Sequence, residues 1–205
     1  MLKDLGLQAF INQLESSEPV PGGGSVAALS SALASALAAM VANLTVGKKN
    51  YEDVSDKMVV LASRMSAHKQ VFVDMIDKDA NSFDSVMKAY KLPKDTEEEK
   101  AQRTLSIQEG MKYAASVPLE VAEKTAQLFD DIAELVELGN KNAQTDALVA
   151  AMMARTAILS ALYNVKINLG SIKDEAYVED MKKRVAQLES LAISREKEIL
   201  ALSDL

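Results

Sequence analysis

The strongest constraint on the fold is a stretch of 22 residues, from Ser25 to Val46, that carries no charged side chain. Its length would allow a membrane span, but it is mostly Ala and Ser and contains Asn43 and Thr45, so its transfer free energy into lipid is poor. A helix that is apolar on every side is instead typical of the centre of a soluble bundle. We therefore expect a buried helix of small residues here, and no membrane association.

Composition favours helix and excludes several classes of function. Aromatic residues make up 4% of the 205 residues and Trp is absent, whereas Ala and Leu dominate. The net charge of −7 argues against a nucleic-acid partner. The chain has no Cys and one His, which excludes disulfides, thiolate chemistry and a multi-histidine metal centre within one subunit. No basic, apolar leader is present, so we expect a cytoplasmic protein.

Glycine, proline and capping residues divide the chain into helical segments, and no segment alternates with the period of a strand. Thr96 and Glu99 fit a capping box, and Pro118 fits the first turn of a new helix. We expect an all-α antiparallel bundle of about seven helices with buried small-residue central helices, forming a single domain over residues 1–205. The expected helices are 2–15, 25–46, about 52–91, 95–115, 116–139, about 145–168 and about 174–202.

A glycine loop precedes the uncharged helix. Its sequence is Pro19-Val20-Pro21-Gly22-Gly23-Gly24-Ser25. The prolines fix the approach of the chain, the glycines leave the backbone bare, and Ser25 is a natural N-cap. Free amides at a helix start suit an anionic or planar polar ligand. A plain turn between elements is the alternative.

The third expected helix carries one packed stripe with two polar interruptions, His68 and Asp79. We interpret His68 as a core histidine. A carboxylate on a core-facing stripe is costly unless it is paired or does chemistry, so Asp79 is a functional candidate. The stripe consists of Val54, Met58, Leu61, Met65, His68, Phe72, Met75, Asp79, Phe83 and Val86.

If short connections make neighbouring helices antiparallel, separate polar segments should meet at one end of the bundle. We predict that Asp79 and the exit of the fifth helix both return to the level of the glycine loop. The residues expected to gather there are Gly22, Gly23, Gly24, Ser25, Asp79, Asn140, Asn142, Thr145 and Asp146.

The segment Gly47-Lys48-Lys49-Asn50-Tyr51 is expected at the opposite end, together with Asn168. One subunit cannot bring both ends onto one small ligand. An antiparallel two-fold partner would join the lysine pair of one chain to the glycine loop of the other. The alternative for the lysines is a solvated helix C-terminus, where cations favour the helix dipole.

The same segments carry a resemblance to a known family. The glycine loop followed by Gly47-Lys48-Lys49 and Tyr51 resembles the signature of the cyclodeaminase/cyclohydrolase family. Further similar segments are Ile76–Ala80 with Phe83, Lys91–Lys94, Asn140–Asp146 and Asn164–Leu169. Thr145 departs from the family pattern, which more often has Ser. The resemblance covers the chain from the first helix to about Gly170.

This resemblance implies an all-helical homodimer that acts on folate one-carbon units. The activity is either formiminotetrahydrofolate cyclodeaminase or methenyltetrahydrofolate cyclohydrolase. Both reactions occur at an amidinium carbon between N5 and N10 of tetrahydrofolate, and neither requires a metal or a cofactor beyond the folate. Each needs a carboxylate near a delocalised cation, an acid for the leaving nitrogen and an oriented nucleophile.

We assign roles to the matched residues as hypotheses. Asp79 or Asp146 stabilises the cationic carbon and handles protons, and Lys48 is a proton shuttle or carboxylate anchor. Tyr51 stacks on the p-aminobenzoyl ring or simply packs, and Asn168 completes the composite site or caps its helix. The remaining expected substrate-binding residues are Gly22, Gly23, Gly24, Ser25, Lys49, Asn140, Asn142 and Thr145.

A non-enzymatic helical scaffold or interaction protein is the competing class. Long amphipathic helices, Met-rich stripes and a charged last helix would all suit it. A scaffold has no need for a glycine loop and Asn/Asp clusters, so we favour the enzyme. A di-iron bundle is excluded because one His cannot supply two Glu-x-x-His motifs.

Overall fold

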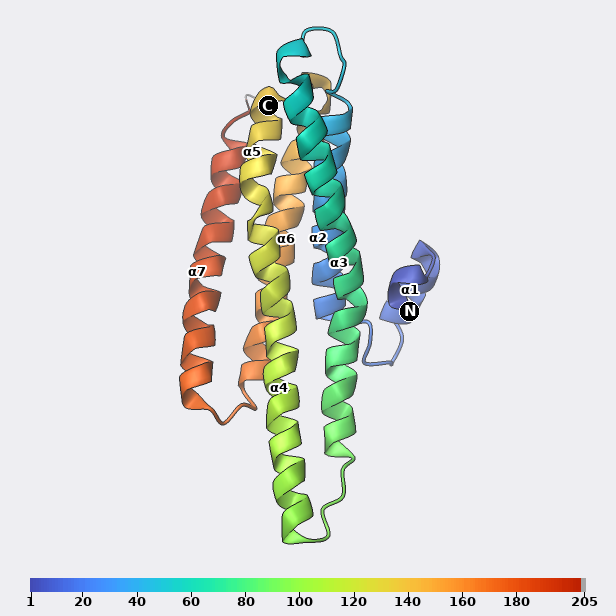
Figure 1. Cartoon of the computed structure of the whole chain (residues 1–205), viewed down its shortest axis with the longest axis vertical. Helices are drawn as coiled ribbons and strands as arrows, with labels where there is room; N and C mark the ends of the chain where they lie inside the picture. Colours follow the sequence, from blue (N-terminus) through green and yellow to red (C-terminus); the bar gives the residue numbers. More distant parts are fainter. Residues whose placement is uncertain (204–205) are drawn as a thin grey trace.

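The computed structural model describes residues 1–203 and confirms the all-α antiparallel bundle. Within these residues the chain forms seven α-helices and no strand (Figure 1). Short 3-10 turns precede α1, α3 and α6. The helices are α1 Leu7–Leu14, α2 Gly23–Asn43, α3 Ser55–Tyr90, α4 Glu97–Ala126, α5 Leu128–Leu138, α6 Gln144–Leu169 and α7 Glu175–Leu200.

Helix α2 forms the centre of the bundle, as its uncharged sequence predicts. It packs mainly against α3 and α6, and its buried positions are almost all Ala or Ser. The buried hydroxyls are satisfied within the bundle. Ser35 donates to the carbonyl of Ser31, and Ser31 pairs with Thr125 of α4 at 2.6 Å. Small side chains therefore allow close helix contact, and their hydroxyls leave few polar groups without partners.

Two segments are long and apolar enough to cross a membrane by length and composition: α2 and Lys141–Leu169. Of their apolar windows, 61% and 44% respectively are buried inside the bundle. Burial against other helices accounts for most of the apolar character of α2 without a lipid phase.

Helix α3 spans 36 residues and buries the predicted stripe along its upper half. Met58, Met65 and Phe72 are fully buried there. His68 is partly buried and stacks on Phe72 with ring centroids 6.3 Å apart, and burial lowers its pKa. The predicted Thr96–Glu99 capping box opens α4.

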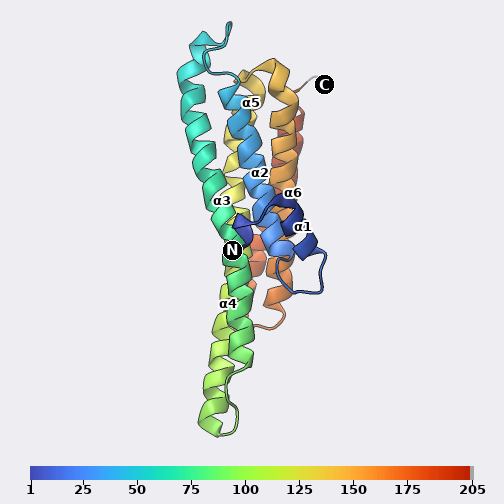
Figure 2. The ribbon, with the colours of Figure 1, turned by 90° about the vertical axis from the view of Figure 1, so that its right-hand side faces the viewer.

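The expected break at Ser116 is wrong. Helix α4 continues through Pro118 to Ala126, and α5 then runs on in the same direction (Figures 1 and 2). Pro118 has no N–H for the carbonyl of Ala114, and the side-chain nitrogen of Asn168 donates to that carbonyl instead, at 2.8 Å. Because a neighbouring helix satisfies the carbonyl freed by the proline, the chain does not need to turn.

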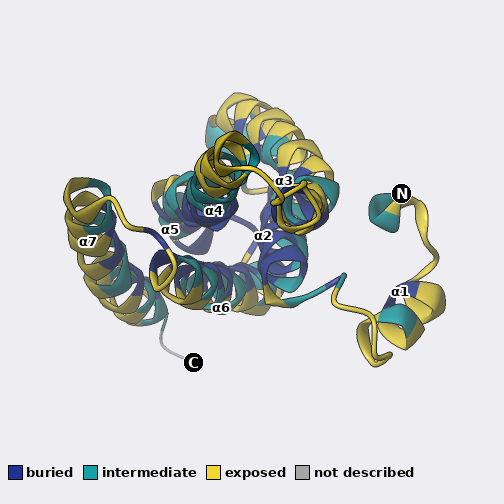
Figure 3. Ribbon diagram, turned by 90° about the horizontal axis from the view of Figure 1, so that it is seen from below, coloured by how far each residue is buried: buried dark blue, intermediate teal, exposed yellow. Residues whose placement is uncertain are grey.

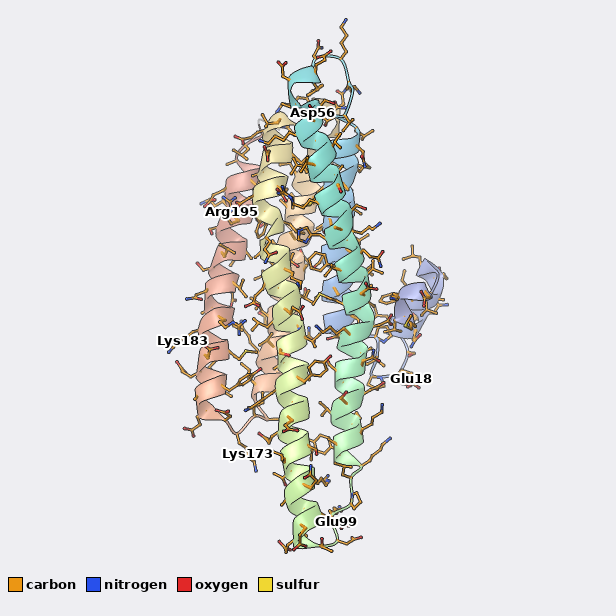
Figure 4. The ribbon with its side chains drawn as sticks, viewed as in Figure 1. Glu18, Asp56, Glu99, Lys173, Lys183 and Arg195 are labelled. Atoms are coloured by element: carbon orange, nitrogen blue, oxygen red, sulfur yellow. The ribbon has the colours of Figure 1, made fainter. Side chains whose placement is uncertain are left out.

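Helix α1 projects from the bundle, as Figure 3 shows from below. Phe10 is its only buried residue, whereas Leu7 and Ile11 are exposed. The loop that follows α1, marked by Glu18 in Figure 4, leads to the start of α2.

Candidate active site

The glycine loop opens α2 without a side-chain cap. Gly22 is the N-cap residue and the helix begins at Gly23, so the expected N-cap role of Ser25 is wrong. Ser25 lies inside the first turn and is fully buried. Its hydroxyl lies 3.1 Å from both the carbonyl oxygen of Ile76 and Oδ2 of Asp79 on α3. The first turn of α2 is therefore attached to α3 at Asp79.

Two glycines are required by close neighbours from other helices. A Cβ at Gly24 would overlap the carboxylate of Asp79. A Cβ at Gly23 would lie 2.9 Å from the side-chain nitrogen of Asn164 on α6. The bare backbone lets a carboxyl group and an amide approach the positive end of the α2 dipole.

Asp79 is partly buried, and burial raises the pKa of its carboxyl above the ordinary value. Hydrogen bonds from the hydroxyl and backbone amide of Ser25 oppose this shift but do not cancel it. Asp79 makes no ion pair within the described residues. The carboxyl therefore keeps its proton to a higher pH than an exposed aspartate does, as a general acid requires.

These groups line a cavity of about 310 Å³, here called the glycine-loop pocket. Its polar inner wall combines the glycine backbone with the side chains of Asp79, Ser82, Asn164 and Asn168. The nitrogen of Asn164 donates to the carbonyl of Ser160 at 2.9 Å, as that of Asn168 does to Ala114. Both amides are thereby fixed in orientation, and their oxygens remain available as acceptors. The other lining residues are Pro19, Val20, Phe83, Ala114 and Ile167.

The predicted meeting of the Asn140–Asp146 segment with the glycine loop is wrong. Because α4 and α5 form one rod, this segment lies at the other end of α2, roughly 30 Å away along 21 residues of helix. There the backbone amide of Asn140 donates to the hydroxyl of Thr45 at 2.8 Å, and its side-chain nitrogen donates to the carbonyl of Leu44 at 3.0 Å.

Lys48, Lys49 and Tyr51 lie at this far end, as expected. The hydroxyl of Tyr51 accepts a hydrogen bond of 2.9 Å from the backbone amide of Lys141. Both lysines are exposed. We call the residues gathered here the far-end cluster: Lys48, Lys49, Tyr51, Asn140, Asn142, Thr145 and Asp146.

The predicted position of Asn168 is also wrong, at the opposite end of the bundle. It was expected beside the lysines, but it lines the glycine-loop pocket because α6 descends from the far end to the level of α2's start. Sequence reasoning also missed Asn164 and Ser82 as lining residues. The spacing of Asn164 and Asn168, four residues apart on α6, was the available signal for a shared polar face.

No group of three or more His, Cys, Asp or Glu side chains within residues 1–203 is arranged to hold a metal ion. The glycine-loop pocket is built from one carboxyl group, two side-chain amides, a hydroxyl and the backbone amides at the start of α2.

The fold and this site define an all-helical protein with a pocket at the glycine-rich start of its central helix. A family model described as formiminotransferase-cyclodeaminase matches residues 6–187, and the chain belongs to that family.

Individual relatives agree with this assignment. The chain is 41% identical over 186 residues to a methenyltetrahydrofolate cyclohydrolase of Methylorubrum extorquens, covering 90% of this chain and 88% of that protein. It is 37% identical over 187 residues to the rat formimidoyltransferase-cyclodeaminase, covering 91% of this chain but only 35% of the relative. The crystal structure of a formiminotetrahydrofolate cyclodeaminase from Thermotoga maritima superposes with a TM-score of 0.87 at 34% identity, covering 98% of this chain and 97% of that one.

Proposed function

We propose that this chain is a folate one-carbon enzyme that acts at the carbon between N5 and N10 of tetrahydrofolate. The activity is that of a formiminotetrahydrofolate cyclodeaminase or a methenyltetrahydrofolate cyclohydrolase. The observation that carries the proposal is the protonatable Asp79 in the glycine-loop pocket, beside two anchored amides. The names of the relatives support both reactions.

The two reactions make matched demands on the pocket. In cyclodeamination, N10 attacks the formimino carbon on N5 and gives up its proton, the imino nitrogen takes up two protons in all, and its bond to that carbon breaks as ammonia leaves. In cyclohydrolysis, water attacks the cationic methenyl carbon, the bond to N5 breaks, and N5 takes up a proton while the formyl group stays on N10. Both pass through a tetrahedral carbon with a nitrogen leaving group.

Asp79 meets these demands in its two protonation states. The protonated carboxyl donates to the leaving nitrogen, and the carboxylate stabilises the neighbouring amidinium charge. Its raised pKa keeps both forms accessible nearer neutrality than an exposed aspartate allows. The oxygens of Asn164 and Asn168 accept hydrogen bonds from ring N–H groups of the pterin, and the amides of Gly23 and Gly24 bind a carbonyl oxygen.

We further propose that the enzyme is a homodimer with a composite site between subunits. The exposed face of α2 and α6 is apolar: Leu33 is 47% exposed, and Met40, Val149 and Met152 are exposed beside it. A second copy packed antiparallel on this face would form an isologous interface across the middle of α2. The two-fold axis would then place one far-end cluster opposite the partner's glycine-loop pocket.

In such a dimer the far-end cluster of one subunit would act at the glycine-loop pocket of the other. Lys48 and Lys49 would hold substrate carboxylates or move protons across the interface, and Asn142, Thr145 and Asp146 would contact the substrate from the second subunit. Asn140 and Tyr51 have structural bonds within their own chain, to Thr45 and Lys141. Their contribution would be to hold the cluster in place.

We propose that the reaction uses no cofactor beyond the folate, because the amidinium carbon is already electrophilic. The net charge of −7 supports a small-molecule substrate rather than nucleic acid. Burial of most of α2's apolar window supports a soluble protein. We propose that it acts in the cytoplasm without membrane contact.

Two parallel assays test the function. Purified protein is incubated with 5,10-methenyltetrahydrofolate while the methenyl absorbance is followed, and with 5-formiminotetrahydrofolate while ammonia is measured. Loss of absorbance above the uncatalysed rate indicates the cyclohydrolase, and ammonia release indicates the cyclodeaminase. If neither substrate reacts or shifts the melting temperature, the enzyme proposal is wrong and the helical scaffold is favoured.

A further inference from the structure

Helix α3 extends well past the start of α2. Asp79 lies level with the first turn of α2, as the close approach of Gly24 shows. Helix α3 continues for another 11 residues to Tyr90, which is roughly 16 Å of helix. In Figures 1 and 2 the lower part of α3 runs beside α4 only, and Glu99 marks the tip of this hairpin in Figure 4.

The face of α3 that covers α2 above Asp79 is uncovered below it, and it remains apolar. Phe83, Met87 and Tyr90 follow Asp79 at four, eight and eleven residues, on one side of the helix. They are 37%, 41% and 44% exposed. Val86 and Ala89, between them, are buried, and Val86 contacts Gly110 of α4. Arg103 of α4 lies over the ring of Tyr90, 5.6 Å from its centroid. Phe83 and Met87 are therefore the exposed part of the stripe that is separate from the packed face of the hairpin.

The glycine-loop pocket opens onto this stripe. Phe83 lines the pocket one helical turn from Asp79, and Ile167 of α6 lines it while remaining 74% exposed. The polar groups Asp79, Asn164 and Asn168 belong to the same cavity. The pocket thus joins a polar wall to two large apolar side chains that solvent still reaches. Such an arrangement suits a ligand with a polar ring attached to an apolar aromatic one.

We infer that Phe83 and Ile167 bind the p-aminobenzoyl ring of the folate substrate and thereby determine its affinity. This inference rests on the proposed function. The aryl ring is bonded directly to N10, so a reacting carbon placed at Asp79 leaves the ring within one helical turn of it, which is the spacing of Phe83. Tyr51, which the sequence suggests as the residue that stacks on the p-aminobenzoyl ring, lies at the far end of the same chain.

The test compares Phe83→Ala and Ile167→Ala with a matched control, Val60→Ala. Val60 is also an exposed apolar residue of α3, at 56% exposure, and does not line the pocket. We expect each pocket variant to raise KM for the wild-type substrate about tenfold with kcat changed less than about threefold, because a lost aryl contact is worth about one decade of binding. The control should keep both constants. Melting temperatures check that all variants fold.

Fragment inhibitors provide a second readout. p-Aminobenzoylglutamate should inhibit the wild type competitively and inhibit Phe83→Ala about tenfold more weakly. 6-Methyltetrahydropterin, which lacks the aryl ring, should inhibit both equally. If the wild type turns over folate but Phe83→Ala and Ile167→Ala keep the KM and inhibition constants of Val60→Ala, the inference is wrong and the function stands. If the wild type has no folate activity, the proposed function itself fails.

Discussion

At the scale of single residues, Asp79 is held at the start of α2 by groups that both oppose and favour its charge. Burial disfavours the carboxylate, while Ser25 hydrogen bonds favour it, and the balance raises the pKa. The folded state therefore binds this proton more tightly than the unfolded chain does. The stabilising contribution of the protonated form is complete below the ordinary pKa and is lost as the pH rises through the folded pKa.

Asp79→Asn should reveal this linkage in thermal stability. The amide resembles the protonated carboxyl, so the variant escapes the loss that the wild type suffers as Asp79 ionises. We expect melting temperatures of variant and wild type to agree near pH 4, and the variant to melt higher near pH 8. Thermal melts across this pH range provide the measurement. A variant that melts lower at pH 8 but not at pH 4 would contradict the raised pKa.

Gly24→Ala should destabilise the protein, because its Cβ overlaps the Asp79 carboxylate. We expect a loss of about 1–3 kcal/mol in the free energy of unfolding, typical of overpacking. Gly6→Ala is the control, since a Cβ at Gly6 meets nothing within 4 Å. Adding Asp79→Ala should remove much of the penalty, as expected for residues in contact. Strict additivity in urea unfolding would show that the overlap is not the cause.

At the scale of elements, the sequence predicted what depends on local pattern. The capping box at Thr96, the small-residue core of α2 and the stripe of α3 from Met58 to Met75 are all confirmed. Local pattern was insufficient at Pro118. A proline in the first turn of a helix and a proline inside one look alike in sequence. Here the proline lies inside the helix because the side-chain nitrogen of Asn168, 50 residues later, donates to the carbonyl of Ala114.

A double-mutant cycle at this proline tests that explanation. Asn168→Ala should cost about 1–2 kcal/mol, because the buried Ala114 carbonyl loses its donor. In a Pro118→Ala background the restored backbone N–H at position 118 can reach the same carbonyl, so Asn168→Ala should cost much less. Chemical denaturation of the four proteins measures the coupling. Equal costs in both backgrounds would mean that Asn168 does not compensate for the proline.

At the scale of the whole molecule, the direction of the α4–α5 rod determines which polar segments meet. Because the chain does not turn at Pro118, the Asn140–Asp146 segment lies at the far end and Asn168 lies in the glycine-loop pocket. Both mispredicted positions follow from this one error. The pairing of Asp79 with the glycine loop survived, because α2 and α3 are joined by a short connection and must be antiparallel. Which distant segments meet therefore depends on whether the chain reverses direction at every connection between helices, and no local motif determines this.

Subunit mixing tests the composite site at this scale. Lys48→Met and Asp79→Asn subunits should each form inactive homodimers, whereas a mixed dimer has one site with both changes and one site with neither. We expect co-expression of the two variants to restore activity to about a quarter of the wild-type value, because half of the dimers are mixed and each has one intact site. No recovery in a sample shown to contain mixed dimers would contradict a site composed of Asp79 from one subunit and Lys48 from the other.

The most direct test of the central claim is the turnover of Asp79→Asn on 5,10-methenyltetrahydrofolate and 5-formiminotetrahydrofolate. Asp84→Asn serves as the control, since Asp84 is an exposed aspartate of the same helix outside the glycine-loop pocket. The account predicts that Asp79→Asn folds normally and loses at least about a hundredfold in kcat/KM on the substrate that the wild type uses, while Asp84→Asn keeps its activity. Turnover by Asp79→Asn within a few fold of the wild type would contradict it.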